Sequence, residues 1–269
     1  MNPAIVVTGA SSGIGRELAR VAARDGSLML LVDQSQRGLG DLAVELASAG
    51  VQADALSLDL VEPDAGERIE YALSKRGLYC DVLVNCAGFG MFGPAAEIDR
   101  AEQMRVHDVN SRALTELSLR FLPSMVARGR GGILNVGSIS GYAPGPYMAV
   151  YCATKAYVQS FSAALAAEVA GTGVTVTCLT PGVVQTAFFD RIGETYLFKI
   201  LPCTSACETA AAGWRGFKAG KRVVIPNRID RMIRGFCSLI PDGVLLRLIT
   251  RLQRPSLRAA PEEDSRSQI

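Results

Sequence analysis

The fold is decided by the stretch Thr8-Gly9-Ala10-Ser11-Ser12-Gly13-Ile14-Gly15, which joins an apolar, strand-like run to a segment of helical periodicity. The run is Ile5–Thr8 and the periodic segment is Ile14–Arg24. Glycines allow a tight turn and let backbone N–H groups approach a pyrophosphate, whose charge a helix N-terminus stabilises. At a strand–helix junction, such a turn predicts a dinucleotide site. Its candidate cofactor-binding residues are Thr8, Gly9, Ser11, Ser12, Gly13, Ile14 and Gly15.

Strand-like and helix-like segments alternate along the chain. Short apolar runs, many of them rich in β-branched residues, are separated by longer segments with helical periodicity. The predicted strands are Ile5–Thr8, Leu28–Val32, Ala53–Leu58, Val82–Asn85, Ile133–Val136, Val174–Leu179 and Val223–Ile225. Short buried strands separated by helices predict βαβ units, and therefore an α/β fold with a parallel sheet that helices cover on both faces.

The chain reads as one domain. Before the C-terminus it contains no internal repeat, low-complexity tract or Pro/Ser-rich linker. We therefore expect a single domain over residues 1–258, which includes a substrate lid and a basic C-terminal extension within 187–258. Residues 259–269 are polar, and we expect a frayed tail there.

Composition excludes several classes of protein. Of the 269 residues, 49% are hydrophobic and 20% are charged, which does not fit a disordered chain. No uninterrupted apolar stretch reaches the roughly 18 residues that span a bilayer, and the N-terminus lacks the basic region of a secretory signal. Seven cysteines and one histidine provide neither metal-ligand spacing nor a Ser-His-Asp hydrolase. We expect a cytoplasmic protein with reduced thiols and no metal site.

Positive charge is concentrated near the C-terminus. Residues 215–258 hold eleven Lys or Arg against two acidic residues, a net charge of +9, whereas the whole chain carries +2. Arg247, Arg251, Arg254 and Arg258 fall on one side of a helix, and Leu245, Leu246, Leu248, Ile249 and Leu252 form the other side. A solvated helix face is the favoured interpretation. A membrane surface or an acidic partner is the alternative, and nucleic acid is not expected because no aromatic residues interleave.

An acidic residue follows the second predicted strand. Asp33 lies about 20 residues past the glycine turn, where a carboxylate accepts hydrogen bonds from the adenosine ribose. The same charge repels a 2′-phosphate, and Gln34 offers no compensating positive charge. NAD is therefore favoured over NADP. Arg37 keeps NADP open as the alternative.

A tyrosine and a lysine open the longest helical segment. Tyr151 and Lys155 stand four residues apart, so both side chains can face one pocket. A free tyrosine has a pKa near ~10, and a neighbouring ammonium lowers it towards the range useful for a general base. Ser138 follows the strand Ile133–Val136, at the carboxyl end where α/β proteins build their sites. Its hydroxyl can hydrogen-bond a substrate oxygen on which charge develops.

These motifs together resemble the short-chain dehydrogenase/reductase family in its compact, single-domain subtype. The resemblance covers roughly residues 4–186. Its motifs are Thr8–Gly15, Asp59, Asn85–Gly88, Asn110, Ser138, Tyr151 with Lys155, and Pro181–Gly182 with Thr186. Each motif alone is weak evidence, and their occurrence in this order is specific.

The resemblance implies a role for each motif. The catalytic residues would be Asn110, Ser138, Tyr151 and Lys155. The residues added to the cofactor site would be Asp59, Leu60, Asn85, Ala87, Gly88, Tyr151, Lys155, Pro181, Gly182, Val184 and Thr186. In such proteins Asp59 would contact the adenine and Asn110 would hold a water for a proton relay. Cys86 departs from the family pattern, which usually has a second Asn there.

Fold, assembly and reaction follow from the same resemblance. It implies a seven-stranded, doubly wound Rossmann-type sheet and a homodimer or homotetramer. It also implies hydride transfer between NAD(P) and an alcohol or ketone, with Tyr151 as general acid/base. An apolar lining predicted from residues 90–92, 142–148, 187–190 and 196–198 favours a bulky hydrophobic substrate. The alternatives are a 3-ketoacyl reductase of lipid metabolism and a non-catalytic NAD-binding sensor.

Overall fold

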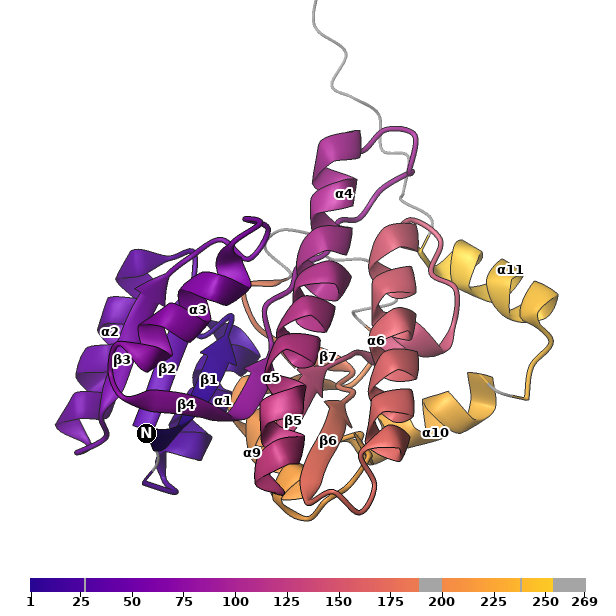
Figure 1. Ribbon diagram of the computed structural model, residues 1–269. Helices are drawn as coiled ribbons and strands as arrows, with labels where there is room; N and C mark the ends of the chain where they lie inside the picture. The colour runs from indigo at the N-terminus through magenta and orange to yellow at the C-terminus, as the bar shows by residue number, and fades with distance from the viewer. Residues whose placement is uncertain (27, 189–199, 238, 254–269) are drawn as a thin grey trace, which may run out of the picture.

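A seven-stranded parallel sheet forms the centre of the molecule in the computed structural model, which describes residues 1–26, 28–188, 200–237 and 239–253 (Figure 1). The strand order is β3-β2-β1-β4-β5-β6-β9. The strands are β1 (Asn2–Thr8), β2 (Leu28–Asp33), β3 (Ala53–Ser57), β4 (Leu78–Asn85), β5 (Gly131–Val136), β6 (Val174–Leu179) and β9 (Val223–Val224). The predicted α/β fold with a doubly wound parallel sheet is confirmed.

Helices pack on both faces of this sheet (Figure 1). One hydrophobic core lies under α1, α2 and α9, and the other lies under α3, α5 and α6. These helices are α1 (Gly13–Ala23), α2 (Gln36–Ser48), α3 (Ala65–Ser74), α5 (Leu114–Arg128), α6 (Ala149–Glu168) and α9 (Ala206–Lys218). No helix in the described ranges is both long enough and apolar enough to cross a bilayer.

Strand β1 shows why the buried strands are apolar on both sides. Ile5 and Val7 join the core under α1 and α2, whereas Ala4 and Val6 join the core on the opposite face. Successive side chains of a strand point to opposite faces, so a strand covered on both faces reads as a continuous apolar run. Burial of each of the isoleucine and valine side chains contributes about 1.5–3 kcal/mol.

The strand order reverses beside β1. The chain builds β1, β2 and β3 towards one edge and then returns to place β4 on the other side of β1. In open parallel sheets, ligands bind outside the carboxyl ends of the strands where the order reverses. The glycine turn follows β1 at this point, because α1 begins at Gly13.

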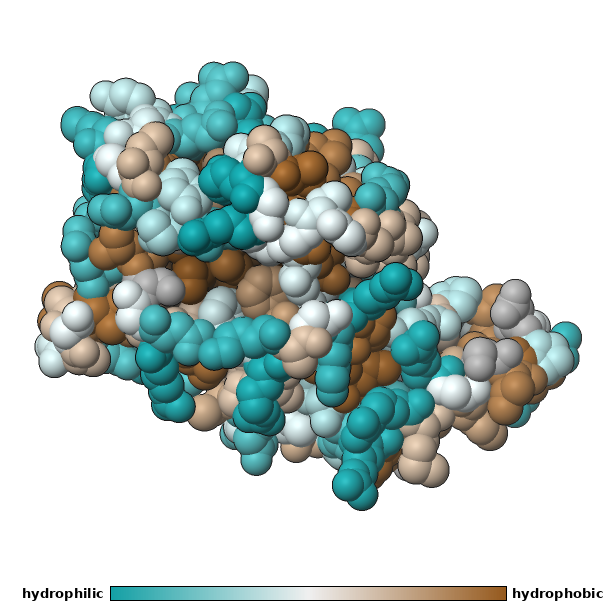
Figure 2. Space-filling model, turned by 60° about the horizontal axis from the view of Figure 1, so that its bottom comes forward, coloured by the Kyte–Doolittle hydropathy of each residue, from teal (hydrophilic) through white to brown (hydrophobic). Residues whose placement is uncertain are grey.

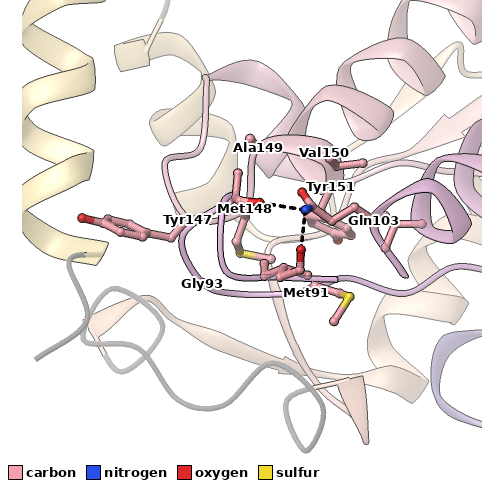
Figure 3. A pocket seen from close by; sticks show the side chains of 11 residues that line it. Met91, Gly93, Gln103, Tyr147, Met148, Ala149, Val150 and Tyr151 are labelled. Atoms are coloured by element: carbon pink, nitrogen blue, oxygen red, sulfur yellow. Dashed lines mark hydrogen bonds between the residues drawn. The ribbon is translucent and has the colours of Figure 1, made fainter. Parts of the chain in front are cut away.

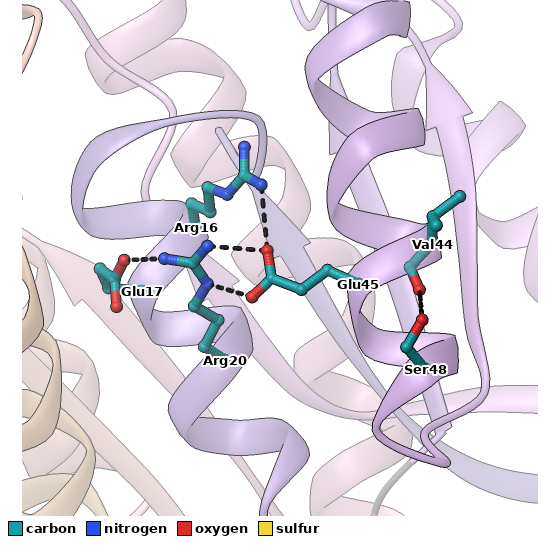
Figure 4. Close-up of polar contacts among 6 residues, drawn as sticks. All are labelled: Arg16, Glu17, Arg20, Val44, Glu45 and Ser48. Carbon is teal, nitrogen blue, oxygen red and sulfur yellow. Dashed lines mark hydrogen bonds and ion pairs between the residues drawn. The ribbon is translucent and has the colours of Figure 1, made fainter.

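An ion-pair network holds α1 against α2 next to the glycine turn (Figure 4). Glu45 accepts from Arg16 Nη2 at 3.1 Å and from Arg20 Nε at 2.6 Å, and Arg20 also pairs with Glu17. The two guanidinium groups lower the pKa of Glu45 to about 2. Because Arg16 directly follows Gly15, this network holds the first turn of α1 in place.

Shorter elements complete the fold. A parallel pair of strands, β7 (Val183–Gln185) and β8 (Cys203–Ser205), lies outside the main sheet and was absent from the strands expected above. The other helices in the described part of the chain are α4 (Arg100–His107), the π-helix η1 (Asp108–Ala113), the 3₁₀ helix η2 (Ile139–Tyr142), α10 (Arg228–Cys237) and α11 (Asp242–Gln253).

The basic C-terminal stretch is helical as expected, but its leucines are not all buried. Leu245 is buried, whereas Leu246 and Leu248 are exposed. Arg247 and Arg251 are exposed on α11, and the other two predicted arginines lie outside the described residues, as does the 259–269 tail.

Candidate functional site

The glycine turn is packed so closely that side chains do not fit there. Gly9 has φ +68°, and a Cβ on it would lie 2.8 Å from the backbone of Ala87. A Cβ on Gly15 would lie 2.0 Å from the carbonyl oxygen of Gly9. A Cβ on Gly13 would lie 3.2 Å from the methyl group of Thr186. The turn therefore brings the motifs after β1, β4 and β6 together.

The N-terminus of α1 has the features of an anion site. Ser12 is its N-cap residue, and within the described residues its side chain makes no capping hydrogen bond. Backbone N–H groups of the first helical turn have no intrahelical partner, and they carry partial positive charge. A turn with glycines at positions 9, 13 and 15 at the start of a helix fits a pyrophosphate.

Thr8 and Asn85 support the crevice from inside the protein. Thr8 Oγ1 accepts hydrogen bonds from the backbone N–H groups of Cys86 (3.1 Å) and Ala87 (3.3 Å). The Asn85 side chain donates to Asn135 Oδ1 at 2.9 Å, in the buried interior. Both side chains thus position the ends of β1 and β4.

Asp33 stands at the carboxyl end of β2 beside the glycine turn. Its carboxylate accepts hydrogen bonds from the backbone N–H of Ser11 at 3.2 Å and of Ser35 at 3.0 Å. These bonds hold the carboxylate at the position expected for a ribose contact. Arg37, the basic residue that left NADP open, is exposed in the first turn of α2.

Arg105 of α4 joins the adenosine end of the site. It forms an ion pair with Asp59 and donates a hydrogen bond to the side chain of Gln34 at 3.4 Å. Asp59 also accepts from the backbone N–H of Val61 at 3.2 Å, and Leu60 between them is buried. The contact joins residues 46 positions apart in sequence, and sequence reasoning missed it.

Ser138, Tyr151 and Lys155 meet where β5 ends. Ser138 hydrogen-bonds the Tyr151 side chain, and its Oγ also accepts from the backbone N–H of Ser140 at 3.1 Å. Lys155 Nζ lies 5.7 Å from the centre of the Tyr151 ring and donates to the carbonyl of Val136 at 2.9 Å. Burial raises the pKa of Tyr151 and lowers the pKa of Lys155.

Asn110 reaches the same place from a π-helical turn. Its side-chain amide exchanges two hydrogen bonds with the backbone of Phe89, at 3.0 and 2.9 Å, and donates to Thr154 Oγ1 at 3.2 Å. A Cβ on Gly88 would lie 3.0 Å from Asn110 Oδ1 and 3.5 Å from Lys155 Nζ. The four predicted catalytic residues therefore converge on one end of the sheet.

A small apolar cavity adjoins Tyr151 (Figure 3). Its volume of 30 Å³ would hold a water or two. Met91 and Met148 line it, and Gln103 closes one side by donating to the carbonyls of Ala95 and Ile98 at 2.9 and 3.0 Å. The predicted lining residues Phe189 and Asp190, and those at 196–198, lie outside the described residues.

The Pro181–Gly182 segment is anchored on both sides. The carbonyl of Pro181 accepts from the backbone N–H of Ile139 at 2.9 Å, so the segment is tied to the loop after Ser138. The backbone N–H of Gly182 donates to the carboxylate of Asp230 from α10. Val184, two residues on, is buried in β7.

A family model described as short chain dehydrogenase matches residues 3–197. The chain belongs to this family. The order of motifs from the glycine turn to Thr186 had led to the same assignment, which is therefore confirmed.

Curated relatives of this short-chain dehydrogenase match part of their own length. A short chain dehydrogenase of Pseudocercospora fijiensis is 35% identical over 184 residues, which are 67% of this chain and 59% of that protein. Sulfoacetaldehyde reductase 2 of Chromohalobacter salexigens is 35% identical over 190 residues, which are 70% of this chain and 75% of that protein.

Solved structures match more of the chain. A short-chain dehydrogenase from Sphingobium yanoikuyae in complex with NADPH is 32% identical, with a TM-score of 0.77 over 89% of this chain and 96% of that one. A bulky-bulky ketone specific alcohol dehydrogenase from Comamonas testosteroni is 28% identical, with a TM-score of 0.72 over 90% and 96%. A 3-ketoacyl-(acyl-carrier-protein) reductase from Brucella melitensis complexed with NADH is 29% identical, with a TM-score of 0.73 over 84% and 98%.

Proposed function

We propose that this short-chain dehydrogenase is an oxidoreductase that interconverts a hydrophobic secondary alcohol and its ketone with NAD as the preferred nicotinamide cofactor. The observation that carries the proposal is the convergence of Ser138, Tyr151 and Lys155 at the end of β5. The crevice beside the glycine turn supplies the matching dinucleotide site.

Tyr151 moves the proton in this mechanism. Its phenolate oxygen takes the proton of the alcohol during oxidation, and the resulting hydroxyl returns a proton to the substrate oxygen during reduction. Ser138, hydrogen-bonded to Tyr151, holds the substrate oxygen within reach of that hydroxyl. Lys155 favours the phenolate through its charge. When bound, the nicotinamide accepts or supplies the hydride.

Asn110 would assist the transfer of the Tyr151 proton to solvent. Its amide is fixed to the backbone of Phe89 and stands within van der Waals reach of Gly88, next to Lys155. A water held between Asn110 and Lys155 would connect Tyr151 to solvent. This relay is part of the proposal.

The preference for NAD rests on Asp33. Its carboxylate is held at the ribose position by two backbone N–H groups, and its charge repels a 2′-phosphate. The relatives do not decide between NAD and NADP, since the Sphingobium structure contains NADPH and the Brucella structure contains NADH. Arg105 forms an ion pair with Asp59, which partly neutralises its positive charge and weakens its attraction for the 2′-phosphate of NADP.

A hydrophobic substrate is supported by the surroundings of Tyr151. Its ring packs against Phe188 with ring centres 5.4 Å apart, and Met148 lies in the adjoining cavity wall. The Comamonas dehydrogenase is specific for bulky-bulky ketones. The second candidate is a 3-ketoacyl reductase, which is favoured by 34% identity to a putative ketoacyl reductase of Streptomyces coelicolor over 193 residues.

Binding and turnover test the proposal separately. Calorimetry with NAD and NADP at one salt concentration should give a lower dissociation constant for NAD. The Asp33→Asn variant should show a smaller difference between the two dissociation constants. Tyr151→Phe should keep cofactor binding and lose turnover of secondary alcohols by about 10²-fold or more, whereas Tyr157→Phe, on the same helix and exposed, should leave turnover unchanged. Binding of neither cofactor would refute the assignment.

Two further outcomes would favour one of the alternative functions instead. A preference for NADP together with turnover of 3-ketoacyl thioesters would favour the second candidate. If the Tyr151→Phe variant kept its full biological effect, the remaining alternative, a non-catalytic NAD-binding sensor, would be favoured.

We also expect a homo-oligomer from the family resemblance, and sedimentation equilibrium tests this expectation directly.

A further inference from the structure

The outward side of α10 carries large apolar side chains. Ile229, Met232 and Phe236 are spaced three and four residues apart and therefore lie along one side of the helix. Met232 is 73% exposed and Phe236 is 61% exposed. We call these three residues the apolar stripe. Leu239, Val244 and Leu248 extend exposed apolar surface towards and along α11.

The stripe faces outward because the opposite side of α10 is fixed to the protein. Asp230 is 1% exposed, and its carboxylate accepts the backbone N–H of Gly182. The guanidinium of Arg234 lies 4.9 Å from the centre of the Tyr142 ring, on η2. With these two anchors, a rotation that buried the stripe would break both contacts.

Beside the stripe, α10 and β9 enclose a basic groove. Its volume is 690 Å³, and its floor is the edge strand with Val223, Val224 and Ile225. Lys221, Arg231 and Arg234 supply the charge, and no acidic side chain lines the groove among the residues that the structure describes. We call this feature the basic groove. Figure 2 shows hydrophobic and strongly hydrophilic side chains next to one another at the right of the view, where the C-terminal helices lie.

We propose that the apolar stripe and the basic groove form a docking surface for an anionic phospholipid bilayer. Amphipathic helices that bury an apolar face at the headgroup boundary and present Lys and Arg beside it bind such surfaces. The basic groove receives headgroup phosphates while Met232 and Phe236 enter the acyl boundary.

A second copy of the chain fits this face less well. In a twofold contact the same patch meets itself, so Arg228 and Arg231 of both copies would be brought into one interface. These arginines are exposed on α10, and its one acidic side chain, Asp230, is buried on the far side. Residues 215–258 carry a net charge of +9, which complements anionic lipid.

Vesicle sedimentation tests the surface, and it does not depend on the proposed oxidoreductase activity. The full chain should sediment with phosphatidylcholine vesicles that contain phosphatidylglycerol, should bind pure phosphatidylcholine weakly, and should be released by high salt. Met232→Glu/Phe236→Glu should reduce the binding constant by about 10-fold or more. The matched control is Val44→Glu/Tyr71→Glu, which adds the same charge at exposed apolar positions of α2 and α3.

Charge is tested with a second pair of variants. Arg231→Gln/Arg234→Gln should reduce binding to anionic vesicles by about 10-fold or more, whereas the exposed pair Arg24→Gln/Lys75→Gln should reduce it much less. Circular dichroism melting confirms that each variant folds. Inorganic phosphate at millimolar concentration should not displace the protein, because it lacks the apolar part.

Three results would overturn the proposal. One is the absence of vesicle binding at low salt. Another is equal binding by the stripe variants and their control. The third is wild-type self-association that Met232→Glu/Phe236→Glu abolishes without any vesicle binding, which would assign this face to a subunit interface.

Discussion

The ammonium of Lys155 donates to the backbone carbonyl of Val136 at 2.9 Å while it stands 5.7 Å from the centre of the Tyr151 ring. The lysine is 6% exposed, and burial lowers its pKa. It therefore ties α6 to the end of β5 and places a positive charge beside the tyrosine. One side chain has both a structural and an electrostatic effect at the site.

Replacement of this lysine should separate the two effects. Lys155→Met should lower kcat/KM by about 10²-fold or more, because the phenolate of Tyr151 loses its nearby cation. The Val136 carbonyl is then left without its donor, at a cost of about 1–3 kcal/mol of unfolding free energy. Steady-state kinetics and urea unfolding measure the two quantities, and Lys75→Met, at an exposed site on α3, should change neither. Unchanged kcat/KM in Lys155→Met would contradict the proposed role.

Tyr151 should resist ionisation in the protein without bound cofactor. Burial raises the pKa of Tyr151 above its ordinary value of 10.0, although Ser138 acts in the opposite direction. An ultraviolet titration should therefore show Tyr151 still protonated at pH 10, where exposed tyrosines ionise. The difference between wild type and Tyr151→Phe isolates its signal. With NAD⁺ bound, the positive nicotinamide ring should move this signal to lower pH.

The glycine turn should tolerate no side chain at its first glycine. Gly9→Ala would place a Cβ at φ +68° and 2.8 Å from the backbone of Ala87. We expect a loss of about 2 kcal/mol or more in unfolding free energy together with loss of dinucleotide binding. Thermal unfolding and calorimetry check the two effects. Gly40→Ala is the control, because a Cβ there meets nothing within 4 Å and should raise stability slightly. Equal stability of the two variants would contradict this prediction.

Local signals were sufficient to predict the sheet and to place Tyr151 and Lys155 on one helix face. Strand β1 with its turn shows the apolar run and the glycines that such a junction needs. Tyr151 and Lys155 lie one helical turn apart, so spacing alone places them on one face. The π-helical turn that carries Asn110 left no comparable pattern in the sequence.

Contacts between distant segments could not be predicted from the sequence. Arg105 reaches Asp59 from α4, and Asp230 reaches Gly182 from α10. Both depend on how helices pack after the sheet forms, which a hydrophobic pattern does not encode. Leu246 and Leu248 were expected to share a side with Leu245, yet Leu245 is buried and the other two are exposed.

The carboxylate of Asp230 should make stability depend on pH. It is buried, its Oδ1 has no hydrogen-bond partner in the described residues, and burial raises its pKa above 3.8. Between pH 3.8 and the raised value, the folded state holds a proton that the unfolded state has released. The unfolding free energy contributed by this group therefore falls as pH rises through that interval.

Asp230→Asn should remove this dependence. An amide of the same shape can still accept the backbone N–H of Gly182 and carries no charge to bury, so unfolding free energy at pH 7 should rise by about 1–3 kcal/mol. Urea unfolding from pH 4 to pH 8 measures the effect, with Asp41→Asn on the exposed side of α2 as the control. The two curves of wild type and Asp230→Asn should converge at the acid end, because the wild-type carboxyl is neutral there as well. Parallel curves would show that the carboxyl does not titrate in this range and that its ionised form is stabilised by a contact other than Gly182.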